Sequence, residues 1–205
     1  MRVFSVTVAV SVCLSSLLSS AGVAAAEDYA GRGYFITCGD EGCFVNSAGY
    51  DLFVPPEGNA WMLEALDFMT AVEVEGTLSD IGDSSAVLSL TGVTPLVDDL
   101  YEGNLRAMQG DWRPVGEENP FVIGIYGMDW SEVLMDEVAD RFMMSVGDAC
   151  ADGTVHAGMV INLYRYGDDP GADACWQMEY IDDSTMTLRD LSGDFGAVDF
   201  ARVSN

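Results

Sequence analysis

The chain has 205 residues, with 34 acidic residues against eight arginines and no lysine, and its formal net charge at neutral pH is −26. Such a charge argues against nucleic acid and anionic membrane surfaces as partners, because both would be repelled. The acidic residues are spread along the whole chain, which is typical of a solvated surface; an acidic face that binds a basic protein is the alternative.

Residues 1–26 have the layout of a secretory signal peptide. Arg2 gives a positive start, an apolar run covers 3–18, and the small residues of 24–26 precede Glu27. We therefore expect cleavage after residue 26 and a periplasmic or extracellular mature protein. The apolar run is interrupted by serines and is short for a membrane anchor, and no other segment is long and apolar enough for a membrane span.

Export makes the cysteines informative. Beyond Cys13 of the signal peptide, the mature chain keeps Cys38, Cys43, Cys150 and Cys175. Four cysteines in an oxidising compartment predict two disulfides with three possible pairings. We expect Cys38–Cys43 and Cys150–Cys175, which place one bridge in each half of the chain. The spacing in "CGDEGC" differs from C-x-x-C and has no nearby histidine, so a structural role is favoured over a redox or metal role.

The sequence pattern of residues 27–95 predicts a small β-rich domain. Three short strands are followed by a short helix over 59–69, with Asn59 as its N-cap. Two alternating strands over 70–78 and 86–93 come next. Three strands, a helix and two strands form the element order of an OB-like barrel. Nucleic-acid binding, which is common for that fold, conflicts with the charge, so only the shape is predicted.

A connector helix is predicted over 96–109. Its apolar positions have helical spacing, and acidic residues lie near its start, where the helix dipole favours them. The apolar positions are Leu96, Leu100, Leu105 and Met108.

Residues 110–205 show persistent alternation of apolar and polar residues. About eight short strands are separated by Gly- and Asp-rich turns such as "GDDPG" and "SGDFG". The in-phase sets include Phe121, Ile123 and Ile125; Phe142, Met144 and Val146; Trp176, Met178 and Tyr180; and Val198, Phe200 and Arg202. Sequential antiparallel strands of this kind predict an eight-stranded barrel, which leaves no open edge.

The stretch Gly110-Asp111-Trp112 resembles the Gly-x-Trp motif at the first strand of lipocalin-like (calycin) barrels. The resemblance covers 110–205 and extends loosely to small barrels of uncharacterised secreted bacterial proteins. It implies that Trp112 closes the barrel base and that Arg202 packs over it. A guanidinium over an indole face is a favourable pair. The fold class is therefore mainly β: an OB-like barrel with one helix, then a lipocalin-like barrel.

An eight-stranded barrel is either filled by its own side chains or holds one small molecule. The candidate ligand-lining residues are Trp112, Phe142, Met144, Met159, Trp176 and Tyr180. Methionines line adaptable apolar sites, but they also fill irregular cores, and core filling is the favoured interpretation.

The sequence gives little support for catalysis. His156 is the sole histidine, and no G-x-S-x-G motif is present. The acidic turns "GDACADG" and "GDDPGAD" do not follow the EF-hand pattern. We therefore expect no catalytic residue, no metal and no cofactor.

Three functions stay open at this point. The first is a non-enzymatic binding protein that holds a small apolar ligand in the C-terminal barrel. The second is an acidic protein-interaction or inhibitor module that acts on a basic partner. The third is an enzyme with an unrecognised carboxylate site. The sequence does not determine the oligomeric state.

Overall fold

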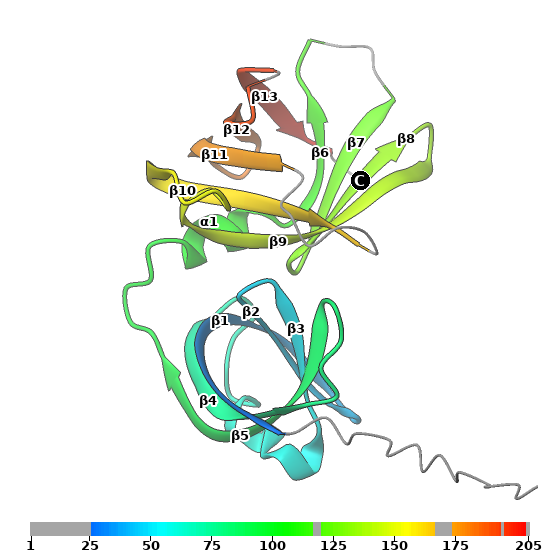
Figure 1. Cartoon of the computed structure of the whole chain (residues 1–205). Coiled ribbons are helices and arrows are strands. Elements are labelled where there is room, and N and C mark those ends of the chain that lie inside the picture. The colour runs from blue at the N-terminus through cyan, green and yellow to red at the C-terminus, as the bar shows by residue number, and fades with distance from the viewer. Residues whose placement is uncertain (1–25, 117–119, 167–173, 194, 204–205) are drawn as a thin grey trace, which may run out of the picture.

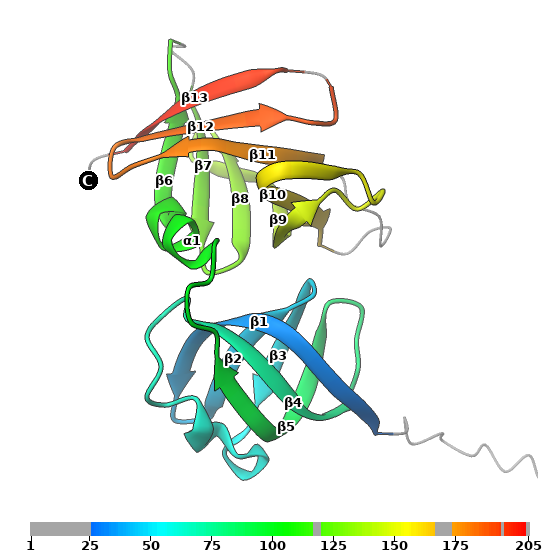
Figure 2. The ribbon, with the colours of Figure 1, turned by 90° about the vertical axis from the view of Figure 1, so that its left-hand side faces the viewer.

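The protein folds into two β-barrels joined by a connector along one side, as Figures 1 and 2 show. A computed structural model describes residues 26–116, 120–166, 174–193 and 195–203. Apart from its last residue, the predicted signal peptide lies outside the described residues. Within the described part, no helix has the length and apolar character needed to cross a bilayer.

The N-terminal barrel has the strand order of an OB-like fold, as predicted. Its strands are β1 (Glu27–Gly39), β2 (Gly42–Ser47), β3 (Tyr50–Val54), β4 (Ala71–Ser79) and β5 (Ser85–Pro95). Neighbouring strands follow β1-β2-β3-β5-β4, and β1 pairs with β4 to close the barrel. β3 and β5 pair in parallel. In β4, Val72 and Val74 are buried while Glu73 and Glu75 are exposed, which is the predicted alternation.

The helix predicted over 59–69 is wrong. Two short 3-10 turns stand at its start instead, η1 (Pro56–Gly58) and η2 (Ala60–Met62). Asn59 has a φ of 66° and Met69 a φ of 62°, so a right-handed helix could cover only the residues between them. There the backbone N–H groups of Met62, Leu63 and Leu66 donate to the carbonyls three residues earlier, which gives tight 3-10 turns in place of an α-helix. The side chain of Asn59 does not cap a helix; its Nδ2 donates to the carbonyl of Leu90 at 2.8 Å.

The connector helix is shorter than predicted: α1 covers Glu102–Met108 rather than 96–109. Asp98 has a φ of 61°, which breaks any helix begun before it. Asp99 then accepts hydrogen bonds at Oδ1 from the backbone N–H groups of Tyr101 (2.8 Å) and Glu102 (3.0 Å), and α1 begins there.

The C-terminal barrel is an eight-stranded antiparallel closed barrel, as predicted. Its strands are β6 (Gly110–Pro114), β7 (Phe121–Tyr126), β8 (Asp129–Leu134), β9 (Glu137–Ala149), β10 (Val155–Arg165), β11 (Ala174–Ile181), β12 (Thr185–Asp190) and β13 (Ala197–Arg202). Each strand pairs with its neighbours in sequence, and β13 pairs with β6 to close the barrel. This is the architecture that the lipocalin-like resemblance implies.

Two apolar cores hold the molecule together. One fills the N-terminal barrel. The other fills the C-terminal barrel and continues through Leu105 and Met108 of α1 to Tyr34, Met69 and Ala71 of the N-terminal barrel. The second core therefore crosses the junction, and burial of apolar surface stabilises the contact between the two barrels.

The two predicted cysteine pairs lie at disulfide-bond distance, with Sγ atoms 2.01 Å apart in Cys38–Cys43 and 1.98 Å apart in Cys150–Cys175. The first pair joins β1 to β2, and the second joins the end of β9 to β11. Both pairs fit an oxidising compartment, extracellular or periplasmic.

Candidate functional site between the two barrels

The base of the C-terminal barrel is closed by Trp112 and Arg202. Trp112 is fully buried, its Nε1 donates to the carbonyl of Met108 at 2.7 Å, and the Arg202 guanidinium lies 4.2 Å from its ring centroid. Arg202 also donates to the carbonyls of Ala107 (2.6 Å), Gln109 (2.5 Å) and Asp183 (2.7 Å). The charge is thus fixed at the base by the indole face and by backbone oxygens.

The surroundings of Gly110 explain why the Gly-x-Trp motif has a glycine at its first position. Its φ is 118°, a conformation that L side chains rarely adopt. A Cβ at this position would also lie 2.8 Å from Nη1 of Arg202. The glycine therefore leaves room for the guanidinium that covers Trp112.

Most of the predicted ligand-lining residues belong to one packed core. Trp112, Phe142, Met144 and Met159 are between 0 and 5% exposed and lie in the same apolar cluster, and Trp176 is partly buried against it. These side chains occupy the barrel interior and are almost closed to solvent. A ligand in their midst would have to displace them.

Tyr180 does not share that interior position. It is 53% exposed, and its hydroxyl donates to Asp182 at 2.8 Å. The register of β11 against β12 shifts between Met178 and Tyr180. This β-bulge inserts one extra residue, so the alternation reverses and Ile181 takes the inward position instead.

One polar atom in the C-terminal core stays without a partner. Nε1 of Trp130 on β8 is buried and has no hydrogen-bond partner in the described part of the chain. Glu132 follows two residues later on the same face, and burial raises the pKa of its carboxyl, while the nearby indole N–H partly offsets the rise.

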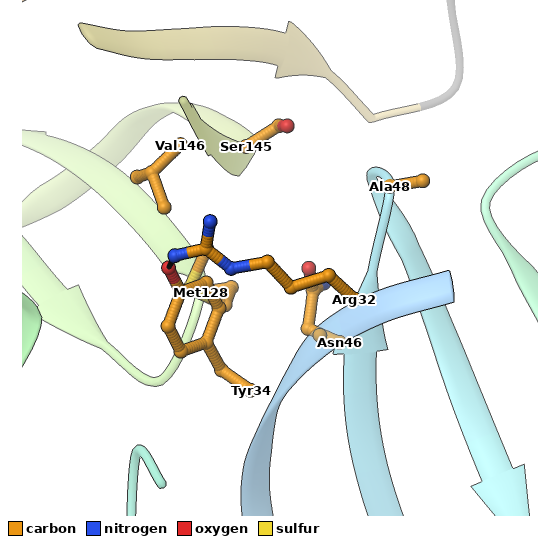
Figure 3. A pocket seen from close by; sticks show the side chains of 8 residues that line it. Arg32, Tyr34, Asn46, Ala48, Met128, Ser145 and Val146 are labelled. Carbon is orange, nitrogen blue, oxygen red and sulfur yellow. Dashed lines mark hydrogen bonds between the residues drawn. The ribbon is translucent and has the colours of Figure 1, made fainter. Parts of the chain in front are cut away.

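A pocket of about 150 Å³ lies between the two barrels, and both contribute to it (Figure 3). The N-terminal barrel supplies residues from β1 and from the β2–β3 hairpin, and the C-terminal barrel supplies residues from the β7–β8 hairpin and β9. The lining side chains are Arg32, Tyr34, Asn46, Ala48, Met128, Ser145 and Val146, with the backbone of Gly33 between the first two.

Strand geometry brings the polar side of the pocket together. Arg32 and Tyr34 are two residues apart on β1, so both side chains point to the same face. Asn46 on β2 is the direct cross-strand partner of Tyr34. This face is the outer surface of the N-terminal barrel, and Tyr34 is only 5% exposed because the C-terminal barrel covers it.

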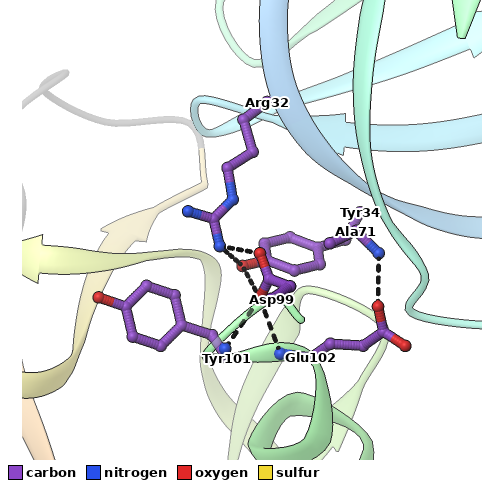
Figure 4. A network of polar contacts seen from close by, with 6 residues as sticks. All are labelled: Arg32, Tyr34, Ala71, Asp99, Tyr101 and Glu102. Carbon is purple, nitrogen blue, oxygen red and sulfur yellow. Dashed lines mark hydrogen bonds and ion pairs between the residues drawn. The ribbon is translucent and has the colours of Figure 1, made fainter. Parts of the chain in front are cut away.

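Arg32 is held in place by a network around Asp99 (Figure 4). Its Nη2 pairs with Oδ2 of Asp99 and donates to the Tyr34 hydroxyl at 3.0 Å. The Asp99 side chain is 2% exposed, whereas that of Arg32 is 44% exposed. The guanidinium also lies 5.3 Å from the ring centroid of Tyr101. Burial raises the pKa of Tyr34 to about 12, so its hydroxyl stays protonated at neutral pH.

Helix α1 ties the connector to the N-terminal barrel beside this network. The backbone N–H of Ala71 donates to Oε2 of Glu102 at 3.0 Å, and Nε of Arg106 donates to the carbonyl of Phe68 at 3.0 Å. Glu102 and Arg106 pair with each other at 2.8 Å. These contacts fix α1 against the N-terminal barrel.

Asn46 directs an acceptor toward the pocket. The residue is 2% exposed, and its Nδ2 donates to Asp51 at 3.0 Å, which assigns the orientation of the amide. Figure 3 shows the amide oxygen pointing toward the C-terminal barrel. Burial raises the pKa of Asp51, the Asn46 hydrogen bond lowers it, and the charge of Asp129 across the junction raises it further.

The pocket residues were missed by the sequence interpretation. Arg32 gives the one signal that was available, since it is the only basic residue in 27–95. The other residues of the N-terminal barrel lie on its outer face or in the β2–β3 turn, whereas Met128 and Val146 belong to or pack against the core of the C-terminal barrel, and the two sets meet only because the barrels dock. In the described part of the chain, no group of three or more His, Cys, Asp or Glu side chains could hold a metal ion.

Comparisons with protein-family models, with curated proteins and with solved structures give no match to this chain.

Proposed function

We propose that this protein is an exported, non-enzymatic binding protein that holds a small molecule in the pocket between its barrels. One observation carries the proposal: a 150 Å³ pocket is walled by both barrels and contains an anchored guanidinium and a nearly buried amide. The interior of the C-terminal barrel, where the sequence predicts an apolar ligand, is occupied by its own side chains. We therefore place the ligand between the barrels and treat the barrel interior as the alternative site.

The export part of the proposal is supported by two features. The first 26 residues have the composition of a signal peptide, and the two cysteine pairs lie at bonding distance. Denaturing mass spectrometry of the secreted protein should give the mass of 27–205 with four protons missing. A mass that includes the first 26 residues would contradict cleavage.

The binding part is tested by native mass spectrometry of the same material. We expect a species heavier than the bare chain by the mass of one small molecule. Val146→Phe, which adds a ring at the pocket wall, should abolish this species. Val138→Phe is the matched control on the same strand, because Val138 is 58% exposed and does not line the pocket. A ligand that is retained equally by Val146→Phe would contradict a site in the pocket.

A further inference from the structure

We infer that the pocket between the barrels selects a compact, neutral molecule that carries a carboxamide on an apolar body. This inference rests on the proposed function and adds the chemical class of the ligand. It follows from four properties of the pocket: its donors, its acceptor, its apolar wall and the charges around it.

Arg32 supplies the donors. Nη2 is engaged by Asp99 and Tyr34, whereas Nη1 and Nε have no hydrogen-bond partner among the described residues. Figure 3 places the guanidinium at the centre of the lining side chains. Since Asp99 and the two tyrosine rings fix the orientation of the guanidinium, a carbonyl oxygen in the pocket would meet donors that are already in position.

Asn46 supplies the acceptor. Its Nδ2 is occupied by Asp51, so its Oδ1 is the group that remains for a ligand. No described residue donates to this oxygen, although the residue as a whole is 2% exposed. A ligand N–H that reaches this oxygen from the pocket would therefore find a free acceptor. A carboxamide carries both groups that the pocket requires: a carbonyl oxygen that accepts from Arg32 and an N–H that donates to Oδ1 of Asn46.

The size and the apolar wall define the rest of the ligand. A cavity of about 150 Å³ holds a molecule of benzene size, as cavities of that volume do elsewhere. Met128 and Val146 of the C-terminal barrel and Ala48 of the N-terminal barrel present apolar atoms to this space. An aromatic or short aliphatic body would therefore contact the C-terminal barrel while its amide faces β1 and β2.

The surrounding charges disfavour an anion. The positive charge of Arg32 is paired with Asp99, and Asp51 and Asp129 stand nearby on opposite barrels. The chain as a whole carries a formal charge of −26. A carboxylate would meet this negative field, whereas a neutral amide uses the same donors without the repulsion.

The test uses benzamide, benzoate and toluene as probes, which share a ring and differ in the polar group. Each is titrated at pH 7 into the full mature chain, and binding is followed by amide chemical shifts of Met128, Ser145 and Val146. We expect benzamide to bind at least tenfold more tightly than either of the other probes.

Arg32→Lys keeps the charge that pairs with Asp99 but removes the guanidinium fork, so it should weaken benzamide binding at least tenfold. The matched control is Arg113→Lys, at an exposed position of β6, which should leave binding unchanged.

A second variant covers the case in which Arg32→Lys loosens the junction. Asn46→Ala removes the acceptor and should weaken benzamide at least tenfold while leaving toluene within a factor of two. Equal binding of benzoate or toluene by the unmodified protein would overturn the amide class and leave the pocket a binding site. If no probe shifts the pocket residues and the native mass is bare, the proposed function fails as well.

Discussion

At the base of the C-terminal barrel, the side chain of Arg202 makes several contacts at once. Arg202 covers the face of Trp112 and donates to three backbone carbonyls from the connector and the β11–β12–β13 region. Gly110 gives it room. The contacts link β13 to the residues that precede β6, so Arg202 ties the end of the barrel to its beginning beside Trp112.

We predict that Arg202→Met destabilises the protein by about 2–4 kcal/mol, because the cation–π contact and hydrogen bonds to three carbonyls are lost together. Urea unfolding followed by tryptophan fluorescence measures the change. Arg113→Met, at an exposed position of the neighbouring strand β6, is the control and should stay within about 0.5 kcal/mol of the unmodified protein. Equal midpoints for the two variants would show that the base contact contributes nothing beyond its charge.

At the scale of elements, each cysteine pair clips a different length of chain. Cys38–Cys43 spans a sequence separation of 5 across one hairpin, whereas Cys150–Cys175 spans 25 and encloses β10. A longer loop loses more conformational entropy in the unfolded chain when it is closed. The second pair therefore restrains the unfolded C-terminal half more strongly.

Replacing both Cys150 and Cys175 by serine should lower the free energy of unfolding by about 3 kcal/mol in the chain-entropy model. The same change at Cys38 and Cys43 should lower it by about 2 kcal/mol, because the closed loop is shorter. Denaturant unfolding of the two double variants gives the comparison. The loop-entropy explanation would be wrong if the hairpin pair mattered more.

The sequence predicted elements whose side chains alternate without interruption. The strands of both barrels follow from such local signals, whereas the pairing of Trp112 with Arg202 was implied by the resemblance of 110–112 to the Gly-x-Trp motif. The helix over 59–69 was wrong because Asn59 and Met69 adopt left-handed backbone, which apolar spacing does not reveal. Tyr180 is exposed because a bulge shifts the phase of β11, and a bulge has no signal in this pattern.

The pocket could not be predicted from the sequence, because its residues are unremarkable within each barrel. Tyr34 alternates with Phe35 on β1 as a surface residue would, and it is buried only by the other barrel. Local patterns carry information on which face of a strand meets its own core. They carry none on how two finished domains dock.

At the scale of the whole molecule, acidic groups meet across the barrel junction. Asp51 of the N-terminal barrel faces Asn46 on its own barrel and Asp129 and Tyr166 on the other. The Tyr166 hydroxyl donates to Asp129 at 2.5 Å, and Arg141 lies 3.8 Å from the same carboxylate. Asp129 thus has partners from its own barrel, while burial and the charge of Asp129 both raise the pKa of Asp51.

Because the pKa of Asp51 is raised in the folded state, its protonated side chain favours folding. This favourable contribution is complete below the ordinary pKa of 3.8. It is lost as the pH rises through the raised pKa and the carboxyl becomes charged. Asp51→Asn should therefore unfold at a higher temperature than the unmodified protein at pH 7, and the gain should vanish toward pH 3. Calorimetry at the two pH values measures this. Asp28→Asn, at an exposed position of β1, is the control, and a gain of the same size there would point to net charge rather than to the junction.

Of the side chains around the pocket, Arg32, Ala48 and Ser145 lie outside both apolar cores, whereas Tyr34, Met128 and Val146 belong to the core that crosses the junction or pack against it. Substitution of Arg32, Ala48 or Ser145 leaves both apolar cores untouched. Changes at these three positions can therefore alter what the pocket recognises while the fold is kept, whereas changes at Tyr34 or Met128 would also disturb the core that joins the barrels.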